Sequence, residues 1–216
     1  TITGLTLTGG NATDGGGIQV LPGATAVLNG DQLEGNTATL GAGAYNAGTL
    51  QMTGDTLNDN SATAFNGAGG GIYNAGIAQV IDSTITSNTA TAGGGIYNTA
   101  STFLADDTLS DDTASLGPGI YNFGNVPQVS LINTILDSAG CLNADGTILD
   151  EGYNVASDDT CGLGSTSLSG SSNIDLGPLA PNGSTGPETQ AIGPGSSAFE
   201  EVPQFHCSIP TDERGD

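Results

Sequence analysis

Basic residues are almost absent from this chain. Its 216 residues include no Lys and a single Arg, Arg214, against 23 acidic residues, and the formal net charge is −22. Phosphate backbones and anionic lipid headgroups repel so acidic a protein. The composition therefore excludes a nucleic-acid partner and an anionic membrane surface, and it favours cations as partners.

Several familiar functional elements are missing as well. No apolar run approaches the roughly 20 residues of a membrane-spanning helix, so we expect no membrane span. The only His, His206, stands beside one Cys, whereas a zinc site needs about four ligands. No glycine-rich loop ends in Lys, so the glycine runs are expected to be architectural rather than phosphate-binding.

Cysteine is scarce but informative. Cys141 and Cys161 bracket one loop, which indicates a disulfide in an exported protein, and Cys207 is left over. The chain begins at Thr1 inside a repeat, so we expect that an export signal was removed or that the chain is a fragment. The expected location is extracellular or at the cell surface.

What the chain does contain is glycine in a repeated motif. Gly-Gly-Gly-Ile-Tyr-Asn at 69–74 recurs at 93–98 and, eroded, at 41–46 and 117–122. The final asparagines are 28, 24 and 24 residues apart, and two further columns keep the same phase. Those columns are Asn36, Asn60, Asn88 and Asp112, and Leu33, Leu57, Ile85, Leu109 and Ile135. A fixed period in the twenties predicts a solenoid.

The segments between these motifs indicate the type of solenoid. Short stretches such as 49–52 and 79–81 alternate apolar and polar residues between Gly and Asn turns, which is typical of strands. We therefore predict an all-β parallel β-helix of about six coils over residues 1–165, with a disulfide-closed end. Residues 166–216 lose the period and are predicted to form an irregular C-terminal extension that packs on the rod or on a neighbouring subunit.

Two side-chain columns are candidate sites in such a coil. One should form a ladder in which each amide bonds to the next, with a structural rather than a binding role: Asn46, Asn74, Asn98 and Asn122. The other should face outward by strand alternation: Tyr45, Tyr73, Tyr97 and Tyr121. This tyrosine stripe is either a stacked ladder that stabilises the wall or a platform for a sugar or a partner.

Stacked acids suggest a cation. With coils in phase, Asp31 lies over Asp55 and Asp82 lies over Asp106, each pair 24 residues apart. Like charges at a strand spacing repel, and no Lys neutralises them. We expect simple salt or a weak Ca²⁺ site at these four residues to stabilise the rod, and no cofactor is otherwise required.

The motifs resemble two bacterial families. The Gly-Gly-Gly-Ile-Tyr-Asn units with Asn-Thr-Ala-Thr turns are similar to right-handed parallel β-helix repeat proteins, including polymorphic outer-membrane-protein repeats. The C-terminal part resembles choice-of-anchor Q domain proteins at Cys141, 152–154, 161–163, 176–180, 191–192, 194–198 and 211–215. These resemblances imply an exported or surface protein. Family members carry a further strand with another Cys and then an anchor, whereas this chain stops at Asp216, which would explain the unpaired Cys207.

The predicted function is a non-enzymatic extracellular structural or adhesive β-solenoid. Exposed strand edges at each end favour head-to-tail association into a fibre, so the expected partners are the protein itself or a cell-surface or glycan partner. One alternative is a carbohydrate-acting enzyme of glycoside hydrolase or lyase type, whose acids would be Asp106, Asp107, Asp111 or Asp112 converging in a groove. A lesser alternative is ice binding by the Thr-x-Thr rows that follow Asn36 and Asn88.

Overall fold

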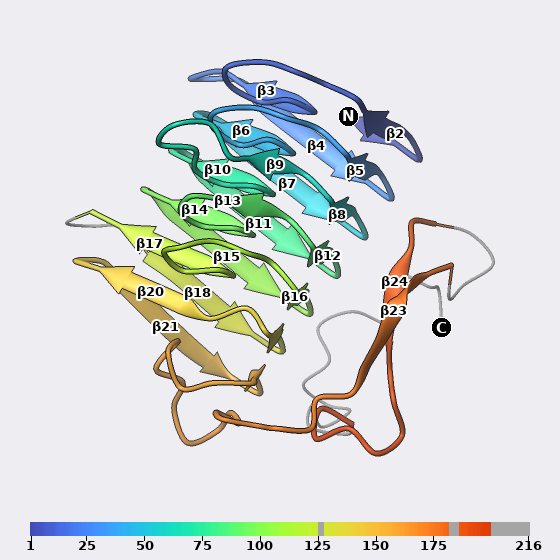
Figure 1. Cartoon of the computed structure of the whole chain (residues 1–216), viewed down its shortest axis with the longest axis vertical. Helices are drawn as coiled ribbons and strands as arrows, with labels where there is room; N and C mark the ends of the chain where they lie inside the picture. The colour runs from blue at the N-terminus through green and yellow to red at the C-terminus, as the bar shows by residue number, and fades with distance from the viewer. Residues whose placement is uncertain (125–127, 182–185, 200–216) are drawn as a thin grey trace.

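The computed structural model describes residues 1–124, 128–181 and 186–199, and all of their regular structure is β (Figure 1). Coils of three short strands stack into a rod, which confirms the predicted parallel solenoid of about six turns. Among these residues no helix is long and apolar enough to cross a membrane. Arg214, His206 and Cys207 lie outside the described residues.

Three parallel sheets run along the rod, with one strand from each coil. The first sheet consists of β1 (Ile2–Thr3), β4 (Thr25–Asn29), β7 (Thr49–Thr53), β11 (Ile77–Ile81), β15 (Ser101–Ala105), β18 (Gln128–Ile132) and β21 (Thr147–Gly152). The second sheet consists of β3 (Ile18–Val20), β6 (Ala44–Asn46), β10 (Ile72–Asn74), β14 (Ile96–Asn98), β17 (Ile120–Phe123) and β20 (Cys141–Ala144). The third sheet consists of β2 (Thr6–Thr8), β5 (Gln32–Glu34), β8 (Thr56–Asn58), β12 (Thr84–Thr86), β16 (Thr108–Ser110), β19 (Ile135–Asp137) and β22 (Val155–Ala156).

Two smaller pairings complete the described structure. Strands β9 (Ser61–Ala62) and β13 (Thr89–Ala90) pair at a corner of the rod. Strands β23 (Leu176–Ala180) and β24 (Thr189–Ile192) form an antiparallel hairpin, which the Pro- and Gly-rich sequence there does not indicate.

The interior of the rod is an apolar column, as the period predicts. Leu33, Leu57, Ile85 and Leu109 stack in register and are fully buried, and so are Ile72, Ile96 and Ile120 of the second sheet. Ile18, in the first coil, is only partly buried. Period-2 alternation turns every second residue of a strand inward, and the inward residue after Leu109 is Leu136 rather than the expected Ile135.

The glycine triplets let the chain turn sharply between closely stacked coils. Gly69 has a φ of +68°, and a Cβ there would lie 2.4 Å from the carbonyl oxygen of Ile72. A Cβ on Gly70 would lie 2.4 Å from the carbonyl oxygen of Gly94 in the next coil. The motif therefore recurs because this corner has no room for a side chain.

The C-terminal edge of the third sheet is covered by the chain itself. The predicted disulfide between Cys141 and Cys161 is confirmed. Beyond it, Leu168 pairs with Val155 of the last coil, and Thr166 accepts a hydrogen bond from the backbone N–H of Tyr153. The hairpin then runs back along the outer face of the third sheet, where the Thr56 hydroxyl donates to the backbone carbonyl of Glu188 at 2.6 Å.

Candidate functional site

The predicted asparagine residues form a continuous ladder inside the rod, here called the Asn46 ladder. Asn46, Asn74, Asn98 and Asn122 are fully buried. Each Nδ2 donates to Oδ1 of the next residue at 2.8, 2.9 and 2.8 Å, and Asn122 donates onward to Asn143 at 2.8 Å. Because these amides face the interior and bond to one another, this ladder holds coils in register and offers no surface to a ligand.

A second ladder, the Asn36 ladder, occupies another corner. Asn36, Asn60 and Asn88 each donate from Nδ2 to the next oxygen of the column, at 3.1, 2.9 and 3.0 Å, and the last acceptor is Asp112 Oδ1. Asp112 Oδ2 is buried and has no hydrogen-bond partner. Burial raises the pKa of the Asp112 carboxyl well above its usual range, despite two hydrogen bonds from Asn88.

A third ladder, the Asp31 ladder, consists of Asp31, Asp55, Ser83 and Asp107. Each side-chain oxygen accepts the backbone N–H of the coil before it: Asp55 from Asp31 at 2.7 Å, Ser83 from Asp55 at 3.1 Å, and Asp107 from Ser83 at 2.8 Å. Burial raises the pKa of Asp55 to about 7, against the lowering effect of the Asp31 and Thr53 backbone N–H groups, and the Asp31 charge raises it further.

The four aspartates of the expected Ca²⁺ site do not come together. Asp31 and Asp55 point into the rod, whereas Asp82 and Asp106 occupy the adjacent column, where the backbone is left-handed with φ of 53° and 59°. In the parts of the chain that are described, no three His, Cys, Asp or Glu residues are grouped so as to hold a metal ion. The two pairs belong to different columns. Asp82 and Asp106 are left-handed turn residues, and the residues directly after them, Ser83 and Asp107, supply the inward acceptor oxygens.

The tyrosine stripe forms a half-buried stack on the second sheet. Tyr45, Tyr73 and Tyr97 lie nearly parallel, with ring centroids 5.3 and 5.0 Å apart and interplanar angles of 8° and 7°. Tyr121 turns 77° from Tyr97, and Phe123 lies beside both rings. The neighbours cover both faces of the Tyr73 ring, so this ring offers no open face to a stacking sugar.

The Thr-x-Thr rows are not continuous. Ala68 pairs with both Leu40 and Ala92, so Gly67 occupies the level between Thr39 and Thr91. Residues 63–66 are an insertion that bulges out of the row, and Phe65 at its tip is 91% exposed. The insertion also accounts for the spacing of 28 instead of 24 residues. An ice-binding face needs a regular flat row, which this corner lacks.

The acids considered for catalysis separate into two groups. Asp107 and Asp112 are buried in the ladders. Asp106, a left-handed turn residue, accepts a hydrogen bond from Asn133 Nδ2 at 2.9 Å. Asp111 alone among the four lines a groove, together with Asp137, which sequence reasoning missed.

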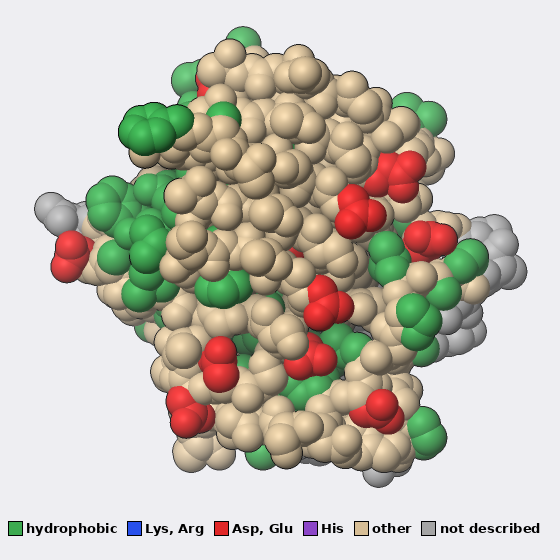
Figure 2. All heavy atoms as spheres, in the orientation of Figure 1, with side chains coloured by type: hydrophobic (Ala, Val, Ile, Leu, Met, Phe, Trp, Pro, Cys, Tyr) green, Lys and Arg blue, Asp and Glu red, His purple; other side chains and the backbone are tan. Residues whose placement is uncertain are grey.

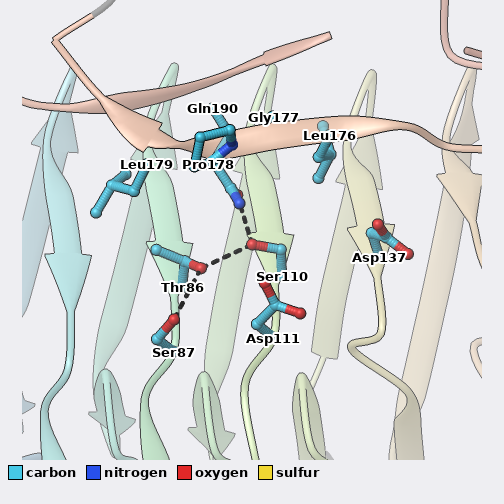
Figure 3. A pocket seen from close by; sticks show the side chains of 10 residues that line it. All are labelled: Thr86, Ser87, Ser110, Asp111, Asp137, Leu176, Gly177, Pro178, Leu179 and Gln190. Carbon is cyan, nitrogen blue, oxygen red and sulfur yellow. Dashed lines mark hydrogen bonds between the residues drawn. The ribbon is translucent and has the colours of Figure 1, made fainter. Parts of the chain in front are cut away.

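That groove lies between the third sheet and the hairpin (Figure 3) and has a volume of about 290 Å³. Its rod side carries Thr86, Ser110 and Asp137, which are register partners on three successive coils. Its hairpin side carries Leu176, Leu179 and the other hairpin residues Gly177, Pro178 and Gln190. The Ser110 hydroxyl contacts Thr86 Oγ1 at 2.8 Å and Gln190 Oε1 across the groove. Burial, and then the charge of Asp111, raise the pKa of Asp137.

Comparisons with known proteins identify no relative. No protein-family model matches the sequence, and no curated protein or solved structure matches it. The two family resemblances therefore rest on the quoted motifs alone.

Proposed function

We propose that this chain is a non-enzymatic extracellular β-solenoid with a structural or adhesive role. The observation that carries the proposal is the direction of the recurring polar side chains. The Asn46, Asn36 and Asp31 ladders all face the interior and bond coil to coil. What the repeat provides is a rigid rod, and the disulfide that closes its C-terminal end suits an oxidising, extracellular setting.

Head-to-tail assembly into a fibre is the finer form of this proposal. Strands β1, β3 and β2 are the first strands of their sheets, and β21 and β20 are the last strands of the first two. A second copy could continue these two sheets, whereas the third sheet already pairs at Val155 with Leu168 of the same chain. An end-to-end contact of this kind does not close on itself, so it would build a filament.

Two measurements test the structural role. Sedimentation over a concentration series, followed by electron microscopy of the samples, should show end-to-end oligomers of constant width. Fluorescent protein added to polysaccharide-coated surfaces and to whole cells should attach without releasing reducing ends. A protein that stays monomeric throughout and attaches to nothing would contradict both parts of the proposal.

A carbohydrate-acting enzyme is the second candidate, favoured by the presence of Asp111 and Asp137 in one groove. A raised pKa on one carboxyl beside a second carboxylate is the arrangement of a general acid with its partner. Release of reducing ends or of unsaturated products from a polysaccharide, abolished by Asp137→Asn and retained by Asp59→Asn, would replace the adhesive proposal with this one.

A further inference from the structure

The groove under the hairpin combines features that none of the ladders has. It opens to solvent, and both of its walls carry side chains that a ligand could contact (Figure 3). Ser110 on the rod wall and Gln190 on the hairpin wall are in contact but 80 residues apart in the sequence. The groove therefore exists only when the hairpin has folded against the rod. At about 290 Å³ it is at the lower end of the usual range for ligand sites, which suits a small ligand.

The two walls differ in chemistry. Asp111 and Asp137 supply carboxylate oxygens on the rod side, next to the hydroxyl of Ser110. Leu176 and Leu179 face them from the hairpin, near opposite ends of the groove in Figure 3. One wall can accept hydrogen bonds from several hydroxyl groups, while the other packs against the C–H surface of a ring.

The charge of the site selects among ligands. Acidic side chains gather where the third sheet meets the hairpin (Figure 2), and none of the described residues that line the groove is Lys or Arg. A uronate or a phosphate would therefore be repelled. A neutral, hydroxyl-rich ligand would instead donate hydrogen bonds to both carboxylates, and bonds to charged acceptors are the stronger kind.

We propose that this groove binds a neutral sugar unit of a glycan, with Asp111 and Asp137 as the hydrogen-bond acceptors. This deepens the adhesive function proposed above and rests on it, because it names the partner of the rod as an uncharged polysaccharide. The sugar would lie along the groove floor between the carboxylates and the leucine side chains of β23.

The test measures binding of free oligosaccharides to the whole disulfide-bonded chain by saturation-transfer NMR and calorimetry. The probes are cellotetraose, xylotetraose and mannotetraose, with tetragalacturonate as the anionic comparison and Ca²⁺ alone as the cation. We expect binding of at least one neutral probe and none of tetragalacturonate. The Asp111→Asn/Asp137→Asn variant should bind about tenfold more weakly or worse, because it loses two charged acceptors.

Asp59→Asn is the matched control. Asp59 is an exposed residue with a φ of 55°, in the same left-handed column as Asp111 (φ 53°), and it is not among the residues that line the groove, so its replacement should leave affinity unchanged. If the double variant misfolds by circular dichroism, Leu179→Ala serves in its place and should also weaken binding.

Three results would each overturn the groove proposal: no neutral probe binds, tetragalacturonate binds equally well, or only Ca²⁺ binds. Failure here is distinct from failure of the adhesive function, because a protein that attaches to cells while ignoring free oligosaccharides refutes the groove alone.

Discussion

Asp112 interrupts an otherwise uniform ladder, and replacing it with Asn should stabilise the protein. In the three preceding coils the ladder amide also donates to a backbone carbonyl: Asn36 to Leu7, Asn60 to Leu33 and Asn88 to Leu57, at 2.9, 2.9 and 3.0 Å. Ile85 is the register partner of Leu57, so its backbone carbonyl is the next acceptor in this series, at the level of Asp112. The buried Oδ2 of Asp112 thus stands where a donor belongs, and it has no partner.

Asp112→Asn exchanges that oxygen for an N–H group without a change of shape. The gain combines a new hydrogen bond with removal of an unsatisfied buried acceptor, which is worth about 1–3 kcal/mol. In a chain of this size each kcal/mol raises the melting temperature by roughly 2–4 °C. Denaturant unfolding and thermal melts of both proteins measure the difference directly.

The pH dependence gives a second, independent check. In the unfolded chain Asp112 loses its proton near its ordinary pKa of about 3.9, whereas burial raises the folded pKa well above that value. Above pH 4 the folded state therefore binds more protons, and the wild-type free energy of unfolding falls as pH rises. The variant lacks this slope, so its advantage should widen from about pH 5 to about pH 8. Asp55 contributes equally to both proteins and cancels in the comparison.

Asp59→Asn controls for a general effect of removing one negative charge. Asp59 is exposed and immediately precedes Asn60 in the same ladder, so its replacement should change stability by no more than about 0.5 kcal/mol. The reasoning fails if Asp112→Asn is no more stable than wild type at pH 8, or if its advantage is the same at both pH values.

Three further predictions concern the corners and the charge of the rod. Replacing Cys141 and Cys161 with Ser should lower stability by about 3 kcal/mol, the value for a loop of this length, and reductant should lower the wild-type melting temperature to match. Gly70→Ala should cost at least about 2 kcal/mol in denaturant unfolding because its Cβ would meet the Gly94 carbonyl, whereas Gly195→Ala, with open space around it, should be nearly neutral. Salt should raise the melting temperature because a net charge of −22 is poorly neutralised, and a melting temperature indifferent to chelator and to seawater salt would contradict this.

The sequence predicts the rod well because the coil repeats. Leu57 and Asn74 recur in phase with identical roles, so period alone identifies the inward apolar column and the Asn46 ladder. The Asp31 ladder is harder to recognise, because that position requires only an acceptor oxygen and is filled in turn by Asp55, Ser83 and Asp107. The insertion at 63–66 also lengthens the spacing at this point, so Ser83 follows Asp55 after 28 residues instead of 24.

The groove could not be predicted from the period. Asp137 lies at the end of β19, and Gln190, on the other wall of the groove, belongs to a hairpin outside the repeat. Nothing in the sequence places a segment from beyond residue 166 against Ser110, since that contact depends on where the chain turns after the last coil. Such a site becomes visible only when the register of the third sheet and the path of the hairpin are both known.

The acidity of the chain has a partly architectural origin. Of the eleven non-glycine residues with positive φ in the described chain, six are aspartates, and they include Asp59, Asp82, Asp106 and Asp111, which directly follow strands of the first or third sheet. Asp and Asn tolerate the left-handed conformation better than other side chains, because their short polar groups bond locally. Turns that recur in every coil therefore accumulate carboxylates without any ligand to bind. Asp137, in a regular strand beneath the hairpin, is at a position that no turn explains, whereas Asp111 occupies a turn position and also lines the groove.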